Sequence, residues 1–136
     1  MIESRFPATP VGSFAGRHVL AELAGVDATL LDDERLIRRT LRTALERANA
    51  TVLDVASKHF HPQGVTAVAL LSESHASIHT YPEFGTVFID VFTCGDRAEP
   101  AVAVDHLVRA LGAKSVHTEL ISRGRAVGLV TLEASA

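Results

Sequence analysis

Apolar residues along this chain recur at every second position in some segments and at every third or fourth in others, which predicts both strands and helices. The alternating or mostly apolar segments predict strands over residues 17–23, 51–56, 64–71, 86–92, 114–121 and 126–132. The helical pattern predicts one helix that Asp32 or Asp33 caps and a second that starts near Pro100 and ends at Gly112. Residues 1–15 carry two prolines and a glycine and are expected to form a loose arm.

The order strand, helix, strand, strand occurs twice in this series, which favours an α+β fold. We expect one domain over residues 1–136, a two-layer α/β sandwich made of two β-α-β-β halves. In it an antiparallel sheet carries the helices on one face. The other face would stay apolar, and we expect a homodimer to bury it.

The composition fits one globular domain and narrows the classes of function. The chain has 136 residues, of which 47% are hydrophobic and 21% charged. No apolar run approaches the roughly 20 residues of a membrane span. A net charge of −3 gives little support to nucleic-acid binding. Cys94 is the only cysteine, so no internal disulfide can form, and a reducing cytoplasm is the expected location.

One polar segment interrupts the apolar pattern between the strands predicted over 64–71 and 86–92. It begins with Ser72, Glu73 and Ser74 and continues with further serines and histidines. Polar side chains between core strands cost free energy, and breaks of this kind tend to mark functional sites. The segment is therefore the candidate site.

A metal site is not predicted in this segment. His75 and His79 would share a zinc ion if the backbone were helical, but Pro82 and the β-branched residues favour an extended backbone. At about 3.3 Å per residue, the two histidines then lie roughly 13 Å apart, whereas each ligand sits only about 2 Å from a zinc ion. Four other histidines are expected at the surface or in hydrogen bonds, namely His18, His61, His106 and His117.

Nucleophilic chemistry at Ser74 has two possible forms. A serine hydrolase is poorly supported, because no Gly-x-Ser-x-Gly elbow surrounds this serine. The alternative starts from the Glu73–Ser74 bond. A serine in a strained turn attacks the preceding carbonyl and forms an ester, and β-elimination followed by hydrolysis leaves a pyruvoyl group. This group is an electron sink that no ordinary side chain offers.

A long motif then points to a known family. It consists of Leu71-Ser72-Glu73-Ser74-His75-x-Ser77-Ile78-His79-Thr80-x-Pro82-Glu83, followed by Asp90-x-Phe92-Thr93-Cys94-Gly95. With these residues the chain resembles the prokaryotic, pyruvoyl-dependent S-adenosylmethionine decarboxylases. The resemblance extends from Gly16 to Gly124, nearly the whole chain.

The resemblance implies a proenzyme that cleaves itself between Glu73 and Ser74. The products would be a β chain of residues 1–73 and an α chain of residues 74–136, whose first residue carries the pyruvoyl cofactor derived from Ser74. His79 matches the family histidine that accepts a proton during processing. Thr66 occupies a position where relatives commonly carry serine, and its hydroxyl keeps a supporting role in processing open.

The resemblance also implies residues that act on the substrate, S-adenosylmethionine. The substrate amine would form a Schiff base with the pyruvoyl group, and Cys94 matches the cysteine that returns a proton after decarboxylation. Glu83 matches the acid that binds the ribose hydroxyls, and Phe60 an aromatic residue that stacks on adenine. The product would serve spermidine and polyamine synthesis.

Two alternatives remain open at this stage. Lys58 and Tyr81 stand where many relatives have histidine and tryptophan, so an altered pocket could accept a free basic amino acid such as ornithine or arginine. The chain could also be an unprocessed homologue that binds a nucleoside or regulates an active paralogue.

Overall fold

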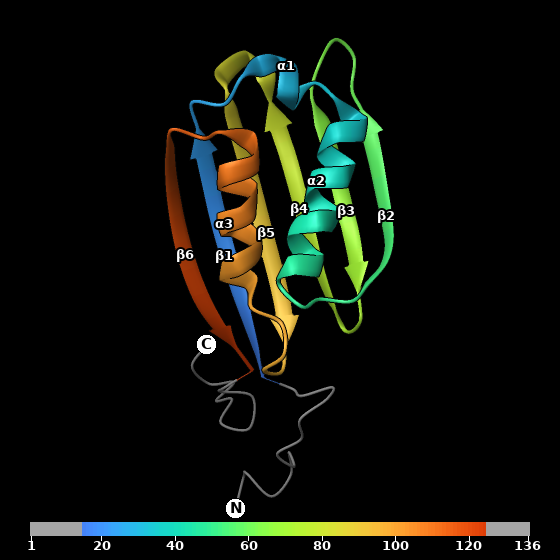
Figure 1. The fold of residues 1–136 in the computed structure, drawn as a ribbon, viewed down its shortest axis with the longest axis vertical. Helices are drawn as coiled ribbons and strands as arrows, with labels where there is room; N and C mark the ends of the chain where they lie inside the picture. The colour runs from blue at the N-terminus through green and yellow to red at the C-terminus, as the bar shows by residue number, and fades with distance from the viewer. Residues whose placement is uncertain (1–14, 125–136) are drawn as a thin grey trace, which may run out of the picture.

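The computed structural model describes residues 15–124 as one six-stranded sheet with helices on one face (Figure 1). The strands are β1 (Gly16–Ala24), β2 (Val52–His59), β3 (Val65–Leu71), β4 (Ser74–Tyr81), β5 (Thr86–Cys94) and β6 (Ser115–Arg123). Their order across the sheet is β2-β3-β4-β5-β1-β6, and all neighbouring pairs are antiparallel. The strand predicted over 126–132 and most of the predicted arm lie outside the described residues.

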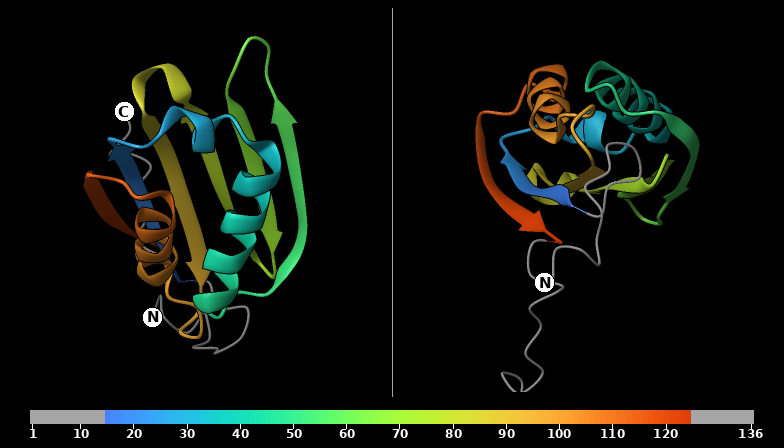
Figure 2. Two further views of the ribbon diagram at one scale, coloured as in Figure 1. Left: turned by 45° about the horizontal axis from the view of Figure 1, so that its top comes forward. Right: turned by 90° about the horizontal axis from the view of Figure 1, so that it is seen from below.

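Two long helices cover one face of this sheet, as the view from below shows (Figure 2). They are α2 (Glu34–Arg47) and α3 (Pro100–Leu111), and two short turns, α1 (Ala28–Leu31) and η2 (Pro82–Phe84), join other elements. The Asp33 carboxylate accepts the Leu36 N–H at 3.0 Å, so Asp33 is the N-cap of α2. The predicted two-layer α+β architecture with an antiparallel sheet is confirmed.

The core fills the space between the helices and the sheet. Alternate residues of each strand point toward the helices, so Val87, Ile89 and Val91 of β5 are buried while Phe88 between them is 43% exposed. The apolar stripe of α2, which includes Ile37, Leu41 and Leu45, packs against this face. Among residues 15–124, no helix is long and apolar enough to cross a membrane.

The opposite face of the sheet, called the open face below, carries large apolar side chains that the single chain leaves uncovered. Leu20, Val68, Leu70 and Phe88 alternate with the buried residues of their strands, and Ile121 of β6 pairs with His18. The prediction of an apolar second face holds at these positions, whereas β4 presents polar side chains on the same face. Within one chain the open face of β5 stays uncovered, because helices cover only the other face.

The polar segment forms a strand of its own, which was not among the predicted strands. Residues 74–81 make β4 at the centre of the sheet, paired with β3 and β5. Its Ala76, Ile78 and Thr80 are buried against the helices, while the polar residues between them face the open side. The predicted extended backbone between His75 and His79 is confirmed, and the polar pattern is that of a strand with one open face.

Candidate functional site

The β3–β4 hairpin turn holds the Glu73–Ser74 bond in an unusual conformation. Leu71 pairs with Ser74, so Ser72 and Glu73 alone form the turn. Glu73 has φ of 62°, a left-handed conformation that glycine adopts freely and other residues rarely do. A non-glycine residue held there costs about 1–3 kcal/mol. The backbone is therefore strained on the amino side of Ser74.

Cys94, the last residue of β5, contacts both sides of this bond. Its thiol donates to the Glu73 carbonyl oxygen at 3.3 Å, and its backbone N–H donates to Ser74 Oγ at 3.2 Å. The first contact polarises the carbonyl, and the second holds the hydroxyl beside it. Glu73, Ser74 and Cys94, predicted from the sequence as site residues, thus lie together at one end of the sheet.

A cavity of about 180 Å³ opens beside these residues. Its lining comes from the β3–β4 turn, the end of β5 and the loops next to α2 and α3, and includes Leu71, Ser72, Glu73, Ser74, Thr93, Cys94, Asp96 and Arg97. The cavity gives a small molecule or water access to Ser74 from the helix side of the sheet.

A second group of site residues surrounds His79 on the open face. Thr66 on β3 pairs with His79 on β4, and the Thr66 hydroxyl is hydrogen-bonded to Nδ1 of His79. The ring centroid of Phe60 lies 6.1 Å from that of His79, and the Tyr81 centroid lies 4.6 Å from it. Thr66 thus orients the imidazole between two aromatic rings.

The two groups do not meet within one chain. Ser74 and His79 are five residues apart on an extended strand, which separates them by about 16 Å. They also point to opposite faces, because Ser74 shares its side with Ala76 and Ile78 while His79 lies on the open face. Glu83 lies exposed in η2, just beyond the end of β4 that is nearer His79.

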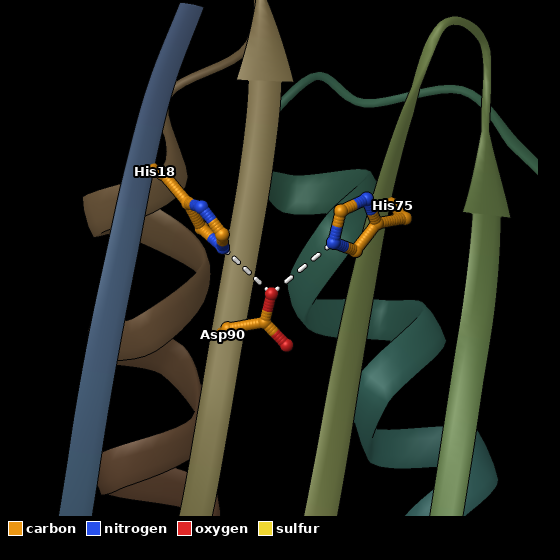
Figure 3. Close-up of side chains that lie close together, drawn as sticks. All are labelled: His18, His75 and Asp90. Carbon is orange, nitrogen blue, oxygen red and sulfur yellow. Dashed lines mark hydrogen bonds and ion pairs between the residues drawn. The ribbon is translucent and has the colours of Figure 1, made fainter. Parts of the chain in front are cut away.

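A third polar cluster lies on the open face between these two groups (Figure 3). His18 of β1 and His75 of β4 both point to the Asp90 carboxylate of β5, at 2.7 and 3.2 Å. The Ser77 hydroxyl also donates to this carboxylate. Burial raises the pKa of Asp90, but the hydrogen bonds from Ser77 and His18 and the electrostatic interaction with His75 outweigh it, so the pKa lies below its ordinary value of 3.8.

The cluster also has the composition of a metal site, since the three side chains offer ligand atoms within 4.8 Å of one another. Its hydrogen bonds favour another interpretation. The Arg123 guanidinium donates to Nδ1 of His18 at 3.0 Å, so Nε2 of that histidine carries the proton that it donates to Asp90. A protonated Nε2 has no lone pair for a metal ion, and the arrangement fits a hydrogen-bonded network.

Sequence reasoning treated some of these residues as ordinary. His18 was expected at the surface or in a hydrogen bond, and it does bond to Asp90, a residue that the sequence marked only as part of the family motif. Thr80 is structural, since its hydroxyl accepts from Val65 N and donates to the Leu31 carbonyl. Thr93 was not predicted as a site residue, and the only feature of the sequence that could have marked it is its place in the motif between Phe92 and Cys94.

Comparison with known proteins gives a consistent result over almost the whole described chain. A family model described as S-adenosylmethionine decarboxylase matches residues 17–124. An S-adenosylmethionine decarboxylase proenzyme of Prochlorococcus marinus is 46% identical over 116 residues, which cover 85% of this chain and 93% of the relative. A proenzyme of the same description from Bacillus cereus is 46% identical over 109 residues, or 80% of this chain and 89% of the relative.

Solved structures agree in fold. The adenosylmethionine decarboxylase of Aquifex aeolicus superposes with a TM-score of 0.75 at 40% identity, covering 80% of this chain and 90% of that one. A Trypanosoma brucei AdoMetDC monomer gives a TM-score of 0.58 at 12% identity over 76% of this chain and 45% of that one. The second match shows a likeness of fold alone.

Proposed function

The chain belongs to the S-adenosylmethionine decarboxylase family, and we propose that it is a self-processing proenzyme whose mature form decarboxylates S-adenosylmethionine for polyamine synthesis. The observation that carries the proposal is the strained Glu73–Ser74 bond with Cys94 on both sides of it. Such a turn raises the energy of the bond that processing would break.

The processing reaction follows from these contacts. Ser74 Oγ attacks the Glu73 carbonyl carbon, a C–O bond replaces the C–N bond, and the hydroxyl proton passes to the freed nitrogen. The Cys94 thiol, a weak donor at 3.3 Å, supports the charge that develops on the Glu73 oxygen. A base then removes the Ser74 α-proton, the Cβ–O bond breaks, and Glu73 leaves as a carboxylate. One water replaces the nitrogen of the remaining dehydroalanine, and ammonia is released.

The residues present fit the pyruvoyl group that this reaction would leave. Residue 74 stays linked to β4 and lines the 180 Å³ cavity, so a group formed there remains fixed by the central strand. When present, the pyruvoyl group supplies an electron sink for loss of the substrate carboxylate. Cys94 lies beside residue 74 and is the thiol in reach to return a proton to the substrate carbon.

A homodimer completes the site in this proposal. His79 is the proposed base, yet about 16 Å and the thickness of the sheet separate it from Ser74 of its own chain. Sheets that pack face to face lie about 10 Å apart. If two open faces pack with their β4 strands running in opposite directions, His79 of one chain approaches the Glu73–Ser74 turn of the other. The exposed Leu20, Leu70 and Phe88 supply the apolar area for this interface.

The same packing would place the nucleoside subsite at the interface. Phe60 is 41% exposed beside His79, with its ring free to stack on adenine. Glu83 is exposed just past β4, where its carboxylate could accept hydrogen bonds from ribose hydroxyls. We assign both to substrate binding. The catalytic role given to the Cys94 thiol requires that it stay reduced, which suits the cytoplasm.

Two measurements test the proposal together. Intact-mass spectrometry of the purified chain should find two fragments that meet at Glu73 and Ser74, and the processed protein should release carbon dioxide from S-adenosylmethionine. A chain that stays whole after prolonged incubation would refute self-processing. A processed chain that releases carbon dioxide only from ornithine or arginine would instead refute the substrate assignment.

A further inference from the structure

Thr93 carries a buried hydroxyl group that has no partner in the described part of the chain. Its side chain is 1% exposed, and its Oγ1 has no hydrogen-bond partner among residues 15–124. Burying a hydroxyl without a partner costs about 1–3 kcal/mol, and such an atom in a native structure calls for an explanation. Valine has nearly the same shape without this cost, so packing alone does not account for a threonine here.

The position of Thr93 connects it with the processing site. The register of β4 and β5 pairs His75 with Phe92, so Ser74 and Thr93 come next on the two strands. Both side chains lie on the helix side of the sheet, and both residues line the 180 Å³ cavity. Neighbouring side chains on one face of an antiparallel pair lie within reach of each other or of one shared water.

The Ser74 hydroxyl, in turn, lacks an acceptor for its hydrogen. Its Oγ accepts the Cys94 N–H at 3.2 Å, but its own O–H finds no acceptor within the described part of the chain. A buried water needs two or more polar partners and a space of roughly 10–15 Å³. The cavity is far larger, and the hydroxyls of Ser74 and Thr93 supply the partners.

We propose that Thr93 is a positioning residue for self-cleavage, which holds a water between its hydroxyl and that of Ser74. This water accepts the Ser74 O–H and, together with the Cys94 N–H, fixes Oγ beside the Glu73 carbonyl carbon. The attacking oxygen, Ser74 Oγ, is then held by two contacts. With the Cys94 N–H alone, the Ser74 side chain would be free to rotate. The inference rests on the proposed self-processing function.

The test follows cleavage of newly synthesised chain over time by intact mass. Thr93→Val removes the hydroxyl and keeps the shape, and we expect about tenfold slower cleavage, because one hydrogen bond to the attacking group is lost. Thr93→Ser restores the hydroxyl and should cleave within about threefold of wild type. The melting temperature is measured in parallel, and Thr93→Val should stay close to wild type, since it keeps the shape and the hydroxyl that it removes bonds only to a water.

A purely structural threonine would behave differently. In that case Thr93→Val would cleave at the wild-type rate, or Thr93→Ser would be as slow as Thr93→Val, and either result overturns the inference. If the valine variant does not fold, Thr93→Ala and Thr93→Ser decide, because they differ only by the hydroxyl. Thr40→Val makes the same chemical change at a buried threonine of α2, outside the cavity, and should leave the rate unchanged. Failure of the wild-type chain to cleave would instead refute the proposed function.

Discussion

The thiol of Cys94 lies 3.3 Å from the carbonyl oxygen of Glu73, although the two residues are 21 positions apart in the chain. The contact arises because β3, β4 and β5 are neighbours and bring the β3–β4 turn to the end of β5. It places one side chain where both proposed reactions occur, the cleavage of the Glu73–Ser74 bond and the later return of a proton to the substrate.

Replacement of the Ser74 hydroxyl tests the first step. Ser74→Ala should abolish cleavage completely, because no oxygen remains to attack the Glu73 carbonyl. Intact mass should show a single chain, and decarboxylation should be lost with it. Residual turnover by this variant would exclude a pyruvoyl group derived from residue 74.

A mixture of two inactive variants tests the shared site. Ser74→Ala and His79→Ala should each fail to mature alone, but co-expressed chains should regain cleavage and activity. With random pairing, half of the dimers are mixed and one of their two sites is intact, so about a quarter of the sites should recover. Recovery is measured as the fraction of His79→Ala chains that are cleaved, which should be about half, because the intact site of each mixed dimer uses the Ser74 of that chain. No recovery, with mixed dimers present, would show that Ser74 and His79 act within one chain.

Removal of the Cys94 thiol should affect chemistry more than binding. In Cys94→Ala that has matured, kcat should fall about 100-fold with KM nearly unchanged, because a proton donor acts only in the transition state. Cleavage of the proenzyme should also slow, since the contact with the Glu73 carbonyl is lost. A rise in KM at constant kcat would assign Cys94 to substrate binding instead.

Relief of the strain at Glu73 should slow processing. Glu73→Gly keeps φ of 62° without strain, and if about 1 kcal/mol is relieved, cleavage should be about fivefold slower. Glu73→Ala is the matched control, because it removes the carboxylate but retains the strained conformation. Equal rates for the two variants would mean that the strain does not contribute. In a Ser74→Ala background, which cannot cleave, the glycine variant should also melt at a higher temperature.

The Asp90 network should give the protein an acid-sensitive component of stability. The pKa of Asp90 in the folded chain lies below 3.8, so its contribution is present above 3.8 and is lost as the pH falls through the folded value. Asp90→Asn should therefore be less stable than the parent at neutral pH and should lose less stability on acidification. Urea unfolding of the Ser74→Ala chain, with and without Asp90→Asn, from about pH 7 to about pH 3 measures this difference. Parallel stability curves would contradict the prediction.

The local pattern of apolar residues in the sequence was enough to predict much of the fold. The alternation in β1, the apolar runs of β3 and β5, the apolar stripe of α2 and the glycine that ends α3 depend on neighbours only a few residues away. The strand β4 was overlooked because its open-face positions are polar, and an alternating strand then looks like a polar segment. The motif itself marked Glu73, Ser74 and Cys94 as a set, and these three do lie together.

The sequence by itself therefore determined the elements other than β4 and the short turns, the exposed apolar positions of the open face and the residues of the candidate chemistry. Only the tertiary structure decided which of them meet. His18 and Asp90 are 72 positions apart yet hydrogen-bonded, whereas Ser74 and His79 are five positions apart yet lie on opposite faces of one strand. The physical reason is that strand order and register set contacts across a sheet, and these depend on packing of the whole chain. A strand's own extended backbone separates residues that are close in sequence.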